Sequence, residues 1–187
     1  MANLILIGPP GAGKSSVATW IEELTGRERV SLDDRAHRHH SSKVPGYETS
    51  ALDPRKVPFM TAYRTWKPFE IISVENHLRT VDNHVIDFGA GHSVYEDRAQ
   101  FERVAAAVHG HHVALLLPDR DIERSRRIYI EMHPRQDPEW IKFIDHVLNN
   151  PSNGSLANVI VAREAKTAKE VAMEVLACFP TWFSQHQ

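Results

Sequence analysis

The sequence has one cysteine, no long hydrophobic run and almost no net charge. Cys178 alone cannot form a disulfide within the chain, which fits a reducing compartment. No stretch approaches the roughly 18 consecutive apolar residues of a membrane-spanning helix, and the first residues do not have the form of a signal peptide. The formal net charge of −2 gives no bulk attraction to nucleic acid or anionic membranes. We therefore expect a cytoplasmic protein that binds small molecules rather than membranes or nucleic acid.

The length and composition suit one domain. A chain of 187 residues with 42% hydrophobic residues can bury one sizeable core. The sequence contains no internal repeat and no low-complexity segment. We expect a single domain spanning residues 1–187, as a monomer or a homodimer.

A glycine-rich stretch near the N-terminus carries the strongest signal. Residues 8–15 match G-x-x-x-x-G-K-S, the Walker A pattern of a phosphate-binding loop, between an apolar run at 4–7 and a helix-like segment at 16–24. In such a loop the backbone amides and the helix dipole hold phosphates, Lys14 reaches the β- and γ-phosphates, and the Ser15 hydroxyl completes the shell of Mg²⁺. We therefore predict ATP or GTP binding. The predicted nucleotide-binding residues are Gly8, Pro9, Pro10, Gly11, Ala12, Gly13, Lys14, Ser15 and Ser16.

Apolar runs alternate with helical periodicities along the rest of the chain, which favours an α/β fold with a parallel sheet. The expected strands are 4–7, 29–32, 85–88, 113–117 and 158–162. The expected helices are 16–24, 69–81, 96–109 and 119–132, one that starts at 137–139 and one that opens with a capping box at 167–170. Residues 35–68 lack clear periodicity, although 55–65 could be helical, and are interpreted as an acceptor-binding insertion. Residues 151–155 are expected to form a loop, and 181–187 a loose tail with Trp182 and Phe183 docked.

Polar residues follow two of the expected strands. Asp33 and Asp34 follow the second strand, at the edge where ligands bind in open α/β sheets. Asp87 lies late in the third strand, where it would hold the water shell of Mg²⁺, although a structural ion pair is an equal alternative. Gly89 and Gly91 come next and would let a ligand approach the backbone.

Arginines and histidines gather in separate segments. One or two of the arginines in or after the 119–132 helix are expected to steady the transferring phosphoryl group, with the others solvated. These arginines are Arg120, Arg124, Arg126, Arg127 and Arg135. Histidines at 37, 39 and 40 lack acidic or cysteine partners at metal-ligand spacing and are interpreted as a solvated face. His109, His111 and His112 are also interpreted as surface residues.

These features together resemble the P-loop kinase superfamily, and within it the shikimate-kinase and nucleoside-monophosphate-kinase group. The likeness rests on the phosphate loop, Asp33, the 85–91 segment, the arginines of 120–135 and the closing strand with its Thr-x-x-Glu helix. The resemblance implies a three-layer P-loop NTPase fold, with a five-stranded parallel sheet of order 2-3-1-4-5 and helices on both faces. It also implies an acceptor site over strands two and three and a lid, here 120–138, that closes on ATP.

The sequence departs from shikimate kinases in the acceptor region. Those enzymes have Asp-x-Asp at strand two and Gly-Gly-Gly after strand three, where this chain has Ser31-Leu32-Asp33 and Gly89-Ala90-Gly91. Their substrate arginine falls near Pro68, with Arg64 and Lys67 as possible substitutes. Because lysine does not reproduce the bidentate contact of arginine with a carboxylate, we do not expect shikimate to be the acceptor.

The expected function is an ATP-dependent, Mg²⁺-requiring phosphotransfer to a small hydroxyl- or phosphate-bearing acceptor. Asp33, with Asp34 in reserve, would orient or deprotonate the acceptor, and Arg127 and Arg135 would steady the transferring group. A regulatory ATPase without an acceptor is the alternative. A nucleic-acid 5′-hydroxyl kinase that uses the basic segment 35–43 is a weaker one. The sequence lacks the guanine-reading Asn-Lys-x-Asp motif, which argues against a GTPase.

Overall fold

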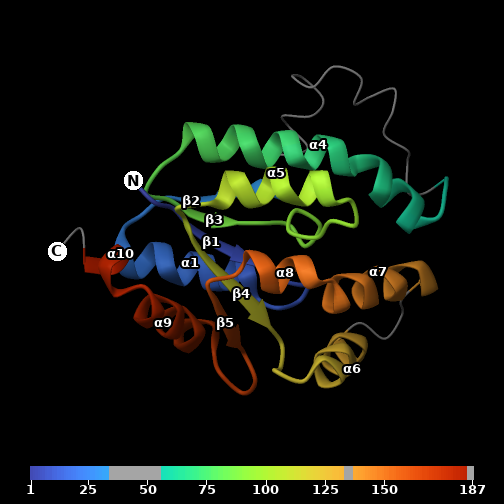
Figure 1. The fold of residues 1–187 in the computed structure, drawn as a ribbon. Helices are drawn as coiled ribbons and strands as arrows, with labels where there is room; N and C mark the ends of the chain where they lie inside the picture. Colours follow the sequence, from blue (N-terminus) through green and yellow to red (C-terminus); the bar gives the residue numbers. More distant parts are fainter. Residues whose placement is uncertain (34–55, 133–136, 185–187) are drawn as a thin grey trace.

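The computed structural model describes residues 1–33, 56–132 and 137–184. Within these ranges, parallel strands form one five-stranded sheet (Figure 1). The strands are β1 (Leu4–Ile7), β2 (Arg29–Ser31), β3 (Val85–Asp87), β4 (His112–Leu117) and β5 (Val159–Ala162). Their order is β2-β3-β1-β4-β5, which confirms the predicted 2-3-1-4-5 order and the α/β fold class.

Helices cover both faces of this sheet (Figure 1). The described helices are α1 (Lys14–Thr25), α4 (Phe59–Thr80), α5 (Arg98–Val108), α6 (Ile122–Met132), α7 (Pro138–Asn149), α8 (Pro151–Leu156), α9 (Ala168–Cys178) and α10 (Pro180–Ser184). The apolar run of β1 is continuous because its side chains alternate between the two faces and both faces are buried. Leu4 and Leu6 pack with α1 and α9, whereas Ile5 and Ile7 pack with α4 and α5. A third cluster of buried side chains joins α4, α6 and α7.

Several predicted helix ends are confirmed. Gly26 has φ 69°, and its backbone N–H donates to the carbonyl oxygen of Glu22. This left-handed residue ends α1. Asp137 caps α7 ahead of Pro138, and Thr167 with Glu170 forms the capping box of α9. Among the described helices, none is both long enough and apolar enough to span a bilayer.

The irregular segment expected over 35–68 extends too far along the chain. The start of α4 at Phe59 agrees with the helix considered possible over 55–65, but the expected helix start at 69 is wrong. α4 runs through Pro68 as one helix of 22 residues. An interior proline costs about 3 kcal/mol in a helix, but here side chains on both sides of it are buried, including Tyr63 before it and Ile71 after it. Packing along the whole length therefore outweighs the local preference.

Three smaller expectations also change. Residues 151–156 form the short helix α8 instead of a loop, because Asn150 caps its first turn. The start of the expected loose tail folds as α10, and Trp182 is buried there as predicted. His109 is exposed, but His111 and His112 are half-buried, and His111 Nδ1 accepts a hydrogen bond from the Asn3 backbone.

Candidate active site

Glycines shape the loop between β1 and α1. Gly8 has φ 139°, and a Cβ there would lie only 2.1 Å from the Leu116 carbonyl oxygen of β4, so no side chain fits. Gly13 has φ 88° and is the N-cap of α1. Because the first N–H groups of a helix have no partner within it and attract anions, the loop has the backbone form that a phosphate site needs.

Lys14 is the first residue of α1, and only 8% of it is exposed. Its ammonium donates hydrogen bonds to the carbonyl oxygens of Gly8, at 2.9 Å, and Pro9, at 3.0 Å. Burial lowers the pKa of Lys14, while the carboxylates of Asp87 and Asp33 oppose this change. The lysine therefore interacts electrostatically with two of the three acids nominated from the sequence, Asp33 and Asp87.

Ser15 and Asp87 meet beside the loop. β3 pairs with β1 so that Asp87 is level with Leu6, and the Ser15 hydroxyl donates to Asp87 Oδ2 at 2.5 Å. Burial raises the pKa of Asp87, and the Ser15 hydrogen bond and Lys14 oppose that rise. Hydroxyl and carboxylate oxygens are the ligands that Mg²⁺ prefers, so this pair fits the ion.

The described residues do not add a larger metal-binding group to this pair. In the parts of the chain that the structure describes, His, Cys, Asp and Glu side chains do not gather into any group of three that could hold a metal. A magnesium ion at Ser15 and Asp87 would complete its shell with phosphate oxygens and water, as is usual for this ion.

Asp33 lies beyond β2 with its side chain 69% exposed. A Cβ on Gly89 would lie 1.8 Å from Asp33 Oδ1, so glycine is needed for this carboxylate to rest against the turn after β3. His92 Nδ1 is 3.6 Å from Asp33 Oδ1, and His92 is only 3% exposed. Within the described ranges neither ring nitrogen of His92 has a hydrogen-bond partner. Asp34 lies outside the described residues, as do His37, His39 and His40.

Lys67 reaches the other predicted glycine of this turn. Its ammonium donates to Glu70 Oε2 at 2.7 Å and to the carbonyl oxygen of Gly91. A Cβ on Gly91 would lie 2.9 Å from Glu70 Oε1 and 3.0 Å from Tyr63 Cε2. The structure therefore brings Lys67 and Gly91 together, with Glu70 and Tyr63 as neighbours that the sequence analysis did not nominate.

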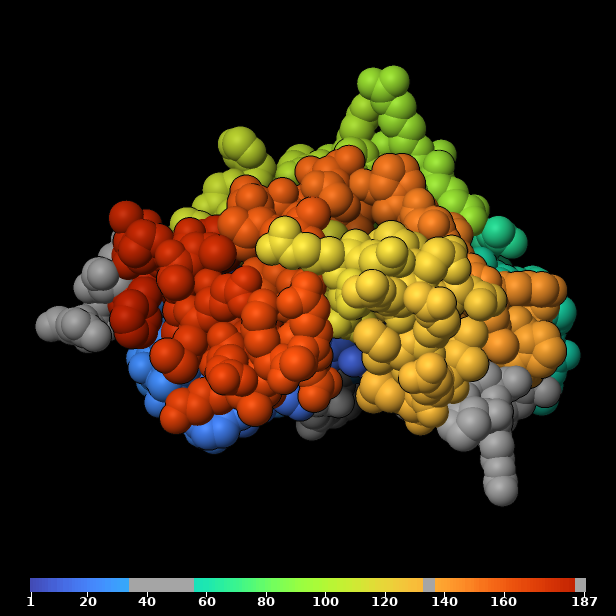
Figure 2. Space-filling view, turned by 90° about the horizontal axis from the view of Figure 1, so that it is seen from below, coloured from blue at the N-terminus to red at the C-terminus, as the bar shows by residue number. Residues whose placement is uncertain are grey.

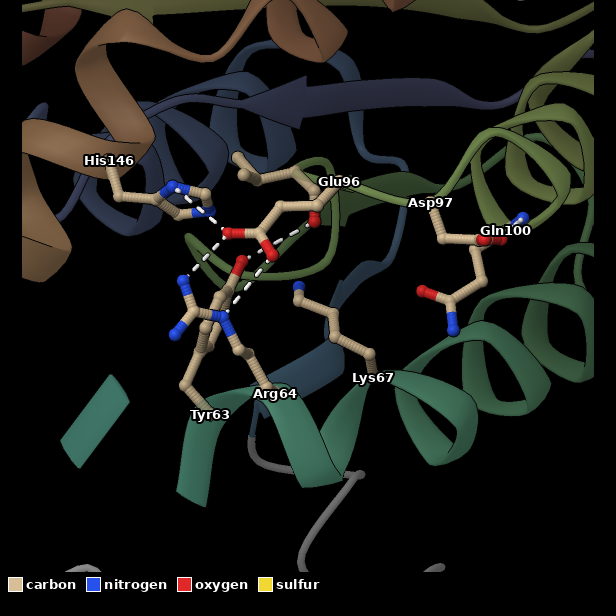
Figure 3. A pocket seen from close by; sticks show the side chains of 8 residues that line it. Tyr63, Arg64, Lys67, Glu96, Asp97, Gln100 and His146 are labelled. Atoms are coloured by element: carbon tan, nitrogen blue, oxygen red, sulfur yellow. Dashed lines mark hydrogen bonds and ion pairs between the residues drawn. The ribbon is translucent and has the colours of Figure 1, made fainter. Parts of the chain in front are cut away.

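Arg64 lies in an adjoining pocket of about 190 Å³ (Figure 3). Its Nε and Nη2 donate to the two carboxylate oxygens of Glu96, at 3.2 and 3.0 Å. His146 Nδ1 of α7 is 3.7 Å from the same carboxylate. The residues that line the pocket are Tyr63, Arg64, Lys67, Val94, Glu96, Asp97, Gln100 and His146.

No protein-family model and no curated protein matches the sequence. Solved structures do match over nearly the whole chain. Shikimate kinase from Acinetobacter baumannii, solved with shikimate, superposes with a TM-score of 0.67 at 19% identity, covering 97% of this chain and 94% of that one. The chain has the fold of shikimate-kinase-like P-loop kinases.

Two further matches support the same P-loop kinase fold. A gluconokinase from Sinorhizobium meliloti gives a TM-score of 0.57 at 16% identity and covers 97% of this chain and 93% of its own. The tunicamycin resistance protein from Deinococcus radiodurans gives 0.56 at 17% identity, with 95% of each chain covered. At these identities the likeness concerns the fold.

The predicted arginines of the P-loop kinase lid do not converge on the loop in the described residues. Arg126 pairs with Asp145 of α7 at 2.6 Å, which ties α6 to α7. Arg124 lies 3.9 Å from Asp119, and the side chains of Arg120 and Arg127 are exposed. Arg135 lies outside the described residues.

Two other side chains lie against the loop instead, and the sequence analysis nominated neither. The Tyr129 ring of α6 would be 3.4 Å from a Cβ on Gly11, and Trp140 Nε1 donates to the Tyr129 hydroxyl. Arg163, which follows β5, places Nη1 3.8 Å from the Cβ position of Gly13. Figure 2 shows dark blue atoms of the N-terminal part of the chain between α6 and the segment after β5.

Proposed function

We propose that this protein is an ATP-dependent, Mg²⁺-requiring kinase that transfers phosphate to a small hydroxyl- or phosphate-bearing acceptor other than shikimate. The hydrogen bond of 2.5 Å between Ser15 and Asp87 supports this most directly. It joins the hydroxyl of the phosphate loop to a carboxylate 72 residues away, where a nucleotide-bound metal would need both. The P-loop kinase fold supports nucleotide use in the same way.

The residues at the carboxyl ends of the strands take distinct roles in this proposal. The loop amides and Lys14 would bind the phosphates, and Ser15 and Asp87 would hold Mg²⁺, which when bound neutralises charge on the phosphates. The Asp33 carboxylate would accept a hydrogen bond from the acceptor hydroxyl, and so orient or deprotonate it. Arg127 and Arg135 are proposed to steady the transferring group. Positioning and charge stabilisation would supply most of the rate.

The acceptor assignment draws on the named neighbours and on α4. A shikimate kinase, a gluconokinase and a sugar kinase from Janibacter share this fold, which favours a small-molecule acceptor. Lys67 stands near the place where the resemblance implies an arginine, and its ammonium already contacts Glu70 and Gly91. A shikimate carboxylate would therefore lack its bidentate partner.

The test is ADP release from Mg·ATP with a panel of shikimate, gluconate, nucleosides, nucleoside monophosphates and aminoglycosides. One acceptor should raise ADP release by orders of magnitude, and chelation of Mg²⁺ should abolish it. Lys14→Ala should lower the turnover at least about 100-fold, since it removes the charge on the phosphates. Lys142→Ala, which removes an exposed lysine of α7, is the matched control. Tight ATP binding with no response to any acceptor would favour a regulatory ATPase instead.

A further inference from the structure

The ammonium of Lys67 is enclosed. Lys67 is 6% exposed, and its Nζ donates to Glu70 Oε2 at 2.7 Å and to the Gly91 carbonyl oxygen. The ring centres of Tyr63 and Tyr95 lie 4.1 and 4.9 Å from the same atom. To bind an incoming anion, Lys67 would have to leave the Glu70 carboxylate, which is only 13% exposed. Leaving one partner of a buried ion pair uncompensated is strongly unfavourable.

The guanidinium of Arg64 is also paired, although the side chains of Arg64 and Glu96 are 57% and 49% exposed. Two of its nitrogens make the parallel hydrogen bonds to Glu96 that a ligand carboxylate would otherwise receive. Burial lowers the pKa of His146, so that its imidazole adds no full positive charge at neutral pH. Among the charged groups that face His146, Glu96 opposes this change and raises the pKa, whereas Lys67 and Arg64 lower it further.

Carboxylates outnumber cations around this part of the described chain. Among the described residues that line the pocket or contact Gly91, the acids are Glu70, Glu96 and Asp97, and the cations are Arg64 and Lys67. Figure 3 shows Glu96 between Arg64 and His146, with Asp97 and Gln100 on the other side of Lys67. A surface with this excess of negative charge repels an anion and does not repel a hydroxyl compound or an amine.

We propose that the acceptor is a hydroxyl compound without a carboxylate or phosphate, such as a polyol, a sugar or a nucleoside, with or without an amino group. The inference rests on the proposed kinase function and narrows its acceptor. Hydroxyl groups of such a molecule can donate to Glu96, Asp97 and Gln100 without displacing any existing ion pair.

The first test uses pairs of acceptors that differ by one anionic group: sorbitol with gluconate, methyl shikimate with shikimate, and each nucleoside with its monophosphate. In every pair with turnover, kcat/KM should be at least about 100-fold higher for the uncharged member, a difference of about 2.7 kcal/mol. Higher kcat/KM for an anionic member of any pair overturns the proposal.

The second test does not depend on turnover. Calorimetric titration of gluconate and shikimate into the protein with Mg·ADP should show a Kd weaker than about 1 mM. Glu96→Gln removes the negative charge and one of the two oxygens that accept hydrogen bonds from Arg64. It should tighten gluconate binding at least about tenfold, as should Glu70→Gln if that variant folds. Glu102→Gln, an exposed acid of α5, is the control and should change nothing.

The two tests separate the proposals. A wild-type Kd for gluconate or shikimate below about 1 mM that Arg64→Gln or Lys67→Gln abolishes would overturn the charge inference, whether or not any acceptor is phosphorylated. A panel without turnover, together with weak carboxylate binding, would remove the kinase proposal and with it the acceptor. It would leave only the statement that this surface does not bind carboxylates.

Discussion

His92→Leu should make the folded protein more stable while lowering its phosphotransfer activity. His92 is 3% exposed, and within the described residues both ring nitrogens lack a hydrogen-bond partner. A buried polar group without a partner costs about 1–3 kcal/mol, and leucine fills a similar volume without that cost. Allowing for imperfect packing against Phe88, we expect the free energy of unfolding to rise by about 1–2 kcal/mol, or Tm by about 3–6 °C.

The activity should change in the opposite direction. His92 Nδ1 lies 3.6 Å from Asp33 Oδ1, so the substitution removes a polar group next to the carboxylate that is proposed to orient the acceptor hydroxyl. We expect kcat to fall about tenfold, which corresponds to about 1.4 kcal/mol of transition-state stabilisation, with KM for ATP unchanged. His92→Asn keeps a donor near the position of Nδ1 and should restore part of kcat.

Urea unfolding and calorimetry measure the stability, and His109→Leu, at an exposed site, is the control that should stay within about 0.5 kcal/mol of the wild type. A His92→Leu variant with a lower Tm than the wild type would refute the claim that the buried imidazole destabilises the fold. An unchanged kcat in a correctly folded His92→Leu would refute its link to Asp33.

Three further predictions concern the loop, the metal and an ion pair. Gly8→Ala forces a Cβ to within 2.1 Å of the Leu116 carbonyl, so the free energy of unfolding should fall by about 2 kcal/mol or more and ATP binding should be lost; a variant with wild-type ATP affinity by titration would contradict this. Asp87→Asn should raise the Mg²⁺ concentration for half-maximal activity at least about tenfold, while an unchanged Mg²⁺ requirement would favour a structural role for Asp87. Hydrogen bonds from Arg103 lower the pKa of Glu75 below its usual 4.5, so near this pH the folded state binds fewer protons than the unfolded state. The pair therefore stabilises the fold fully above pH 4.5, and this stabilisation is lost as the pH falls through the lowered pKa. Glu75→Gln should therefore destabilise by about 1 kcal/mol at pH 7 and by much less at pH 3, and equal effects at both pH values by urea unfolding would contradict the assignment.

Sequence reasoning located one part of the candidate site well. The phosphate loop has a specific pattern, and Asp33, Asp87 and Gly89 follow strands that are neighbours in the sheet, so their meeting at one edge was predictable. The strand order came from a resemblance to known kinases, since short apolar runs do not themselves encode which strand pairs with which.

The rest of the site depends on contacts that leave no local signal. Tyr129 and Arg163 come near the loop only because α6 and β5 return to it in space. The Lys67–Glu70 pair has the (i, i+3) spacing of a helix and was readable in principle. It was missed because Pro68 was taken as the end of an irregular segment, although tertiary packing carries α4 through it.

The contact of Tyr129 with Gly11 gives the protein an optical probe of its own. Trp140 donates its indole N–H to the Tyr129 hydroxyl, and the Tyr129 ring rests on the loop that would receive the nucleotide phosphates. Any ligand that lifts this ring also changes the surroundings of the indole. We therefore expect the fluorescence emission of Trp140 to change when the loop is occupied, and a Trp140→Phe variant to identify its share of the signal.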